Sequence, residues 1–261
     1  MISSEEDDYW LTLRDVRSTN EHSRPPLSLQ VETLAELEPL DAQFGTLPKV
    51  CVPDNVMTRL FGDGSDPSLK TYAIIDAAII HGLVEILASS GLEYRCLFQG
   101  PTAEQLGDAA PYLVALQHDH ELTRRLFTRS GQPADLWERK AGIFLRSPAA
   151  FDELWRHFRK FTRVQDVAGH WLYFRFWEQA TLPAYLEAIS RDHLKCRRFF
   201  GQLVTSFLIP APDEGLLHII HAPKMDHLKP AHGAFVVTVD LHRFCSGVLL
   251  ILGGELFEGH G

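Results

Sequence analysis

The sequence predicts an α/β fold with a mixed, largely parallel sheet, flanking helices and a smaller C-terminal lobe. Short apolar runs such as Thr71–Asp76 and Ala141–Arg146 alternate with segments of helical periodicity. Runs that are apolar throughout are typical of strands buried on both faces, and intervening helices indicate crossover connections. With 261 residues, 45% of them hydrophobic, the chain is long enough for one large domain with an added lobe.

We expect three parts along the chain. Residues 1–66 form an acidic N-terminal extension packed on the core, 67–203 the α/β core, and 204–261 a short C-terminal lobe. The extension is rich in proline and ends in the turn cluster Gly62–Pro67. One short helix is expected within Val31–Glu38.

The core elements follow from apolar runs bounded by turn residues. Strands are expected at Thr71–Asp76, Glu93–Phe98, Ala110–Leu116 and Ala141–Arg146, and helices at Ala78–Ala88, Thr102–Leu106, His120–Thr128, Leu182–Ile189 and Arg191–Phe200. Thr162–Val167 and Trp171–Trp177 alternate around Gly169, which predicts an antiparallel hairpin. In the C-terminal lobe, Ala234–Val239 and Val248–Leu252 are expected to form short strands or buried turns.

The segment Ser147–Phe161 has the clearest helix signals. Ser147 and Pro148 suit the N-cap and first helical position, and acidic residues follow in the first turns. Apolar residues recur at helical spacing at Phe151, Leu154, Trp155, Phe158 and Phe161. Basic residues lie on roughly the opposite side, at Arg156, Arg159, Lys160 and Arg163. The pattern predicts a core helix with a basic outer face.

Composition bears on compartment and partners. No apolar run reaches the ~18 residues of a membrane span, the start is acidic rather than basic, and the four cysteines form no CxxC pair. We therefore expect a cytoplasmic protein with reduced thiols. The net charge is −9, yet residues 120–200 contain 15 basic and 9 acidic residues. This locally basic segment, in an acidic chain without a nucleic-acid motif, favours an acidic protein partner or an internal acidic face over nucleic acid. No membrane insertion is expected.

The motifs of common enzyme classes are missing from the sequence. It contains no GxxxxGK[ST], no GxGxxG after a strand, no GxSxG and no HExxH. Histidines gather at His218, His221, His227, His232 and His242, where scattered structural histidines are favoured over a metal site. Asp76 ends a strand, where it suits helix capping better than catalysis. We expect no enzyme, no cofactor and no metal.

Arginine and aromatic residues concentrate between positions 155 and 177. Both are favoured in protein interfaces because they combine large contact area with multidentate hydrogen bonds. The expected partner-binding residues are Arg156, Arg159, Arg163, Arg175 and Trp177. The alternative is that the aromatic residues are core and the basic face is merely solvated.

Several segments, in order, resemble one family. They are YAIIDAA (Tyr72–Ala78), YRCLFQG (Tyr94–Gly100), LGDAAPYLVAL (Leu106–Leu116), AGIFLRSPAAFDELWRHFRKFTRV (Ala141–Val164), WLYFRFW (Trp171–Trp177) and FFG (Phe199–Gly201). The family, long labelled a domain of unknown function, is that of type VI secretion effector adaptors or chaperones. The resemblance covers about residues 70–205.

The resemblance implies an adaptor that binds an effector protein and helps load it onto a secretion spike, without cofactor or catalysis. This sequence departs from the family at Trp177–Ala180, where a Tyr-Asp-Pro-Arg-like run is usual. The role of that arginine therefore does not carry over. The alternatives are an α/β enzyme with an unrecognised site and a cytoplasmic immunity protein.

Overall fold

A computed structural model describes residues 29–165 and 171–223. Its main feature is a seven-stranded sheet in the order β1-β9-β8-β5-β2-β4-β3. The strands are β1 (Gln30–Leu34), β2 (Lys70–Asp76), β3 (Tyr94–Cys96), β4 (Pro111–Ala115), β5 (Gly142–Ser147), β8 (Ser206–Ala211) and β9 (Leu216–His221). A separate two-stranded hairpin joins β6 (Arg163–Gln165) to β7 (Trp171–Tyr173).

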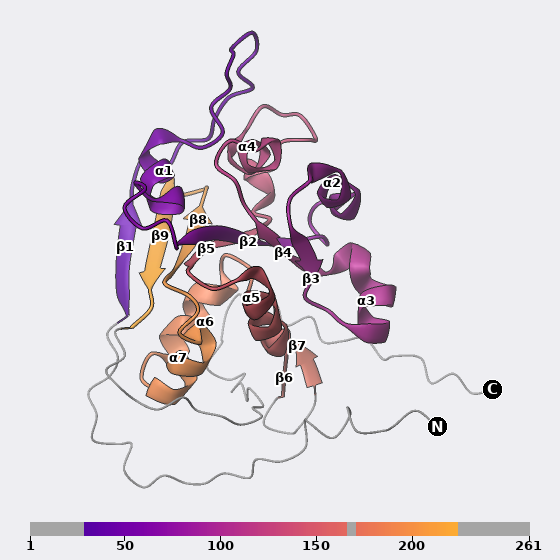
Figure 1. The fold of residues 1–261 in the computed structure, drawn as a ribbon, viewed down its shortest axis with the longest axis vertical. Helices are drawn as coiled ribbons and strands as arrows, with labels where there is room; N and C mark the ends of the chain where they lie inside the picture. Colours follow the sequence, from indigo (N-terminus) through magenta and orange to yellow (C-terminus); the bar gives the residue numbers. More distant parts are fainter. Residues whose placement is uncertain (1–28, 166–170, 224–261) are drawn as a thin grey trace, which may run out of the picture.

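Helices lie on both sides of the sheet (Figure 1). One layer contains α1 (Asp54–Phe61), α2 (Leu83–Ser90) and α4 (Glu121–Phe127), and the other contains α5 (Phe151–Phe158), α6 (Thr181–Ile189) and α7 (His193–Phe200). The helix α3 (Gly100–Leu106) follows the edge strand β3 and has no buried residue. We call the two sides of the sheet the α4 side and the α5 side.

The sheet is antiparallel, so the prediction of a largely parallel sheet is wrong. Every described pairing between its strands is antiparallel, including β2 with β4 and with β5. Successive residues of β2 alternate between the two cores, with Tyr72 and Ile74 on the α5 side and Ala73 and Ile75 on the α4 side. Burial on both faces therefore produced the unbroken apolar runs, whatever the strand direction.

Most expected core elements are present, with shifted ends. The predicted helix at Ala78–Ala88 begins only at Leu83, because Asp76 Oδ1 accepts the Ala78 N–H at 2.9 Å and a turn intervenes. Ser147 ends β5 instead of capping a helix, and Ala150 takes the N-cap position of α5. The hairpin expected around Gly169 is confirmed where β6 pairs with β7.

The chain on either side of the expected core contributes to the same sheet. The helix expected within Val31–Glu38 is wrong, since Gln30–Leu34 is the edge strand β1, paired with β9. The strands β8 and β9, which follow residue 203, continue the sheet from β5. The runs Ala234–Val239 and Val248–Leu252 lie outside the described residues.

Candidate protein-binding face

The first turn of α5 fixes how this helix presents its two sides. The Glu153 carboxylate accepts the Ala150 N–H at 3.1 Å, which satisfies one otherwise free donor at the helix start. Phe151, Leu154 and Phe158 are buried against the sheet, as the apolar stripe predicts. Their burial turns Glu153 and Arg156 toward solvent, whereas His157 faces the interior.

Trp155 differs from the rest of the stripe because its ring lies at the border of the core. It is only partly buried, and its indole N–H donates to the Cys96 carbonyl at 2.7 Å. The guanidinium carbons of Arg95 and Arg159 lie 4.7 and 4.8 Å from the ring centroid. Both separations are within cation–π range.

Two ion pairs at the surface of α5 help to position the arginines around Trp155. The Asp152 carboxylate receives Arg95 Nη1 at 2.7 Å and lies 3.9 Å from Arg156 Nη2. Arg156 is 63% exposed along its side chain. A guanidinium stacked on a ring keeps the hydrogen-bond donors of its edge free. Arg95 and Arg159, which stack on Trp155, can therefore still bind a carboxylate of a partner.

The basic surface continues from α5 into the hairpin. After the turn Arg159–Phe161, Arg163 begins β6, and its guanidinium lies 5.1 Å from the exposed ring of Trp171 on β7. We call the set Arg95, Trp155, Arg156, Arg159, Lys160, Arg163 and Trp171 the α5 face. Five of its members are basic, against Asp152 and Glu153 beside them. The surface thus combines flat apolar rings with an excess of positive charge.

The remaining two expected partner-binding residues lie elsewhere. Trp177 is 2% exposed, and its indole N–H donates to Asp76 Oδ2 at 3.0 Å. The Arg175 guanidinium pairs with the same carboxylate, and its Nε lies 2.6 Å from Glu178 Oε1. Arg175 and Trp177 therefore both bond to the buried Asp76 carboxylate, and we call these three residues the Asp76 cluster.

Asp76 is 1% exposed, so its carboxylate can only serve the interior of the protein. Burial raises the pKa of its carboxyl, while Arg175, the Trp177 indole and the Ala78 amide act in the opposite direction. A buried carboxylate with an arginine and two N–H donors is satisfied. The cluster joins the end of β2 to the segment after β7.

Sequence reasoning assigned Arg156, Arg159, Lys160 and Arg163 to a basic surface, proposed the three arginines for partner binding, and missed Arg95. The signal was the alternation of β3, in which Tyr94 and Cys96 contact the α4-side core, so that Arg95 must point the other way. It could not be used without knowing that β3 lies beside α5.

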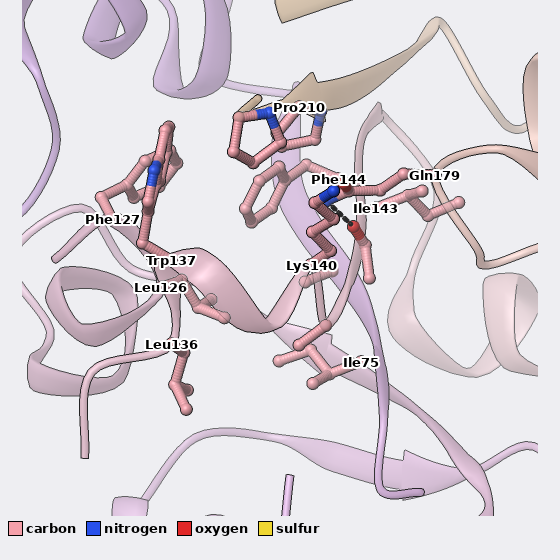
Figure 2. Close-up of a pocket in the computed structure, with 14 residues that line it drawn as sticks. Ile75, Leu126, Phe127, Leu136, Trp137, Lys140, Ile143, Phe144, Gln179 and Pro210 are labelled. Carbon is pink, nitrogen blue, oxygen red and sulfur yellow. Dashed lines mark hydrogen bonds between the residues drawn. The ribbon is translucent and has the colours of Figure 1, made fainter. Parts of the chain in front are cut away.

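A cavity on the α4 side is too small for a ligand. Figure 2 shows it between the turn that carries Trp137 and the strand that carries Phe144, with the Gln179 amide donating to the Gly142 carbonyl at 3.1 Å. Its volume of about 20 Å³ leaves room for about one water molecule. The residues that line it are mostly apolar.

Two of the five histidines considered for a metal site can be placed. His218 and His221 lie on β9, a strand and not a helix, so their odd spacing directs them to opposite faces. His218 Nδ1 is 3.2 Å from Thr33 Oγ1, and His221 Nε2 is 3.8 Å from Glu32. Within residues 29–165 and 171–223, no group of three potential ligands could hold a metal ion. His227, His232 and His242 are outside that range.

Comparison with known proteins gives one match. A family model described as "Domain of unknown function (DUF4123)" matches residues 71–196. That range runs from β2 into α7 and includes the α5 face and the Asp76 cluster. It agrees with the extent of the family resemblance in the sequence. No curated protein and no solved structure matches the chain. Among the described residues, no helix is long and apolar enough to cross a membrane.

Proposed function

We propose that this protein is an adaptor that binds an effector protein through the α5 face and helps load it onto a type VI secretion spike. The α5 face is the observation that supports binding, because it presents exposed arginines, the exposed ring of Trp171 and the half-buried ring of Trp155 in a fixed arrangement. The family resemblance supports the secretion role. The proposed partner surface is acidic, to match the excess of basic residues on this face.

The fixed arrangement favours recognition of another protein. Trp155 is held by its bond to Cys96, and Arg95 is held by both Trp155 and Asp152. Because these side chains are already ordered, binding would cost less conformational entropy than it would for free arginines. Arginine and tryptophan are also the residues most enriched among strong interface contacts.

The experiment uses the proteins encoded beside this chain's gene as candidate effectors. Each is co-expressed with the wild-type chain or with R156E/R159E/R163E, and capture is compared at low and high salt. We expect the wild type to capture one candidate and the triple variant to lose at least 10-fold in affinity, most clearly at low salt. Arg139→Glu, Arg191→Glu and Lys195→Glu together form a matched control away from the face.

Equal capture by a folded triple variant would contradict binding through the α5 face. If the chain instead neutralised a toxin without delivering it, the immunity interpretation would replace the adaptor. That outcome is measured by comparing toxicity and secretion of the captured candidate in cells with and without the chain.

A further inference from the structure

A second exposed surface lies on a loop between β1 and α1. The segment Asp41–Val50, which we call the 41–50 loop, projects beyond the helices of the α4 side (Figure 1). Phe44 is 86% exposed and Leu47 is 90% exposed. Among the described residues these are the two most exposed large hydrophobic side chains. Single exposed apolar residues are ordinary, but two at the tip of one loop form a patch.

The loop is held in shape by hydrogen bonds from its own residues. The Gln43 side chain donates through Nε2 to the Val50 carbonyl at 2.9 Å and accepts the Val50 N–H through Oε1 at 2.7 Å. Asp41 Oδ1 accepts the Gln43 N–H at 2.9 Å, and the Thr46 N–H donates to the Gln43 carbonyl at 3.3 Å. Phe44 and Leu47 are therefore presented from a defined backbone.

The base of the loop is anchored to the body of the protein. The Leu40 N–H donates to the Phe127 carbonyl at 2.8 Å, and the Arg129 N–H donates to the Leu40 carbonyl at 2.9 Å. These bonds join the loop to the end of α4, which packs on the α4 side of the sheet. The sheet thus separates the 41–50 loop from the core that supports the α5 face.

Charge indicates what kind of surface the loop meets. The seven residues 42–48 contain no charged side chain, whereas exposed acidic residues lie before them at Glu36, Glu38 and Asp41. An uncharged tip suits an apolar pocket. Lys49 is the one basic residue of the loop, so residues 36–50 carry three acidic side chains and one basic one. This acidic excess, in a chain of net charge −9, would be repelled by an anionic lipid surface. These charges favour a protein partner over a membrane.

We propose that the 41–50 loop inserts Phe44 and Leu47 into an apolar pocket of a protein other than the one bound at the α5 face. An adaptor has to contact two proteins, and this loop supplies the second contact, on the far side of the sheet. Only that interpretation of the loop as the second contact rests on the proposed function. The pocket itself is inferred from the exposure, the internal hydrogen bonds and the charge of the loop.

The test measures binding of each purified product of the genes that flank this chain's gene. The full chain is compared with F44S/L47S by fluorescence titration. Because each side chain would be buried on binding, we expect one product to bind the wild type about 100-fold or more tightly than the double variant. The melting curves of the two chains should coincide, since both side chains are exposed in the free protein. Leu106→Ser, an exposed leucine on α3, is the matched control and should bind as the wild type does.

Two further variants separate this proposal from neighbouring ones. Gln43→Ala removes both side-chain bonds to Val50 while keeping Phe44 and Leu47, so affinity should fall by about 3- to 10-fold. R156E/R159E/R163E should leave binding of the loop's partner unchanged. Failure of the α5 face alone would therefore contradict the effector site and leave the loop supported.

Several results would overturn the proposal. One is equal binding of every product by F44S/L47S and the wild type, which includes the case in which none binds. Another is flotation of the wild-type chain, but not the double variant, with vesicles of phosphatidylethanolamine and phosphatidylglycerol, which would assign the loop to a lipid surface. A concentration-dependent dimer that F44S/L47S abolishes would assign it to a second copy of the chain.

Discussion

The Asp76 cluster and the α5 face are made from the same types of residue but differ in exposure. In the Asp76 cluster, an arginine and a tryptophan both bond to the aspartate. In the α5 face, Arg156 pairs with Asp152 on the same helix as Trp155. Asp76 and Trp177 are almost fully buried and bond to each other, whereas Asp152, Trp155 and Arg156 remain accessible to solvent. A polar group that is buried and paired contributes to the fold, and removing its partner is costly. Residues of the same kind at the surface contribute little to stability and remain available to a partner.

The largest expected difference concerns the two aspartates. Asp76→Ala leaves the Arg175 guanidinium without its buried partner and the Trp177 indole without its acceptor. We expect the free energy of unfolding to fall by about 3–5 kcal/mol. Asp152→Ala, which also removes an arginine's partner, should cost less than about 1 kcal/mol because both groups are exposed. Urea unfolding of the two variants measures the two free-energy changes. Equal changes would show that the burial of Asp76 does not make it more important for stability than Asp152.

The two tryptophans give the second comparison. Trp177→Ala should lower the free energy of unfolding by about 3–5 kcal/mol, as expected for a large buried side chain. For Trp155→Ala we expect about 1–2 kcal/mol, because the ring is only partly buried and its cation–π contacts are at the surface. Thermal and urea unfolding measure both. A Trp155→Ala loss as large as that of Trp177→Ala would place Trp155 in the core.

Neighbouring positions of α5 provide a comparison within one helix. His157 lies beside Arg156 in sequence but faces inward, where its Nε2 is 2.7 Å from the Phe199 carbonyl. Gly201 packs against the same ring, at a φ of +64° and so close that a Cβ would lie 2.4 Å from His157 Cε1. A side chain at position 201 would therefore both strain the backbone and collide with the imidazole.

Burial lowers the pKa of His157 to about 4, with the charge of Lys160 acting in the same direction. Between pH 6.5 and 4 the unfolded chain binds a proton at this position that the folded chain does not. Stability from this group is thus fully present above pH 6.5 and is lost as the pH falls toward 4, by up to about 3 kcal/mol. Unfolding free energies at pH 7 and pH 4.5 should differ less for His157→Gln than for the wild type. The same pH slope in both proteins would contradict this assignment.

The sequence predicted the elements better than their arrangement. Local signals identified β2, β4, β5, α6 and α7, since each is a clear apolar run or helical stripe. Strand direction could not be found in this way, because burial on both faces removes the alternation that distinguishes an ordinary antiparallel strand. The strand β1 escaped detection for a related reason. Its partner β9 lies nearly the whole described chain away, and its own residues are short of apolar signal.

The candidate site was also predicted only in part, because local periodicity identifies the exposed side of a helix but not contacts between distant segments. Helical spacing placed Arg156 on the outer side of α5, but α5 ends at Phe158, so Arg159 lies in the turn that follows and Arg163 on β6. Periodicity did not reveal that Arg175 and Trp177 turn inward to Asp76, about 100 residues earlier in the chain. That contact depends on which strand ends beside the segment after β7, which is a property of the whole fold.

The smallest expected effect on stability belongs to the α5 face itself. R156E/R159E/R163E should change the free energy of unfolding by less than about 1 kcal/mol, because Arg156 and Arg163 are exposed and Arg159 is only half-buried. Two small terms oppose folding of the variant, namely loss of the cation–π contacts of Arg159 with Trp155 and of Arg163 with Trp171. A third arises because Arg156→Glu places a second carboxylate near that of Asp152, one helical turn away.

The dependence of stability on salt concentration distinguishes repulsion between exposed charges from a structural role of the three arginines. Raising the ionic strength to about 1 M shortens the screening length to about 3 Å, so repulsion between exposed carboxylates should largely disappear. The stability of R156E/R159E/R163E should then approach that of the wild type, apart from the lost aromatic contacts. A loss of about 3 kcal/mol or more that persists in high salt would mean that these arginines are structural, like Arg175. In that case the α5 face would have to be described as part of the fold, and effector binding would have to be sought on another surface.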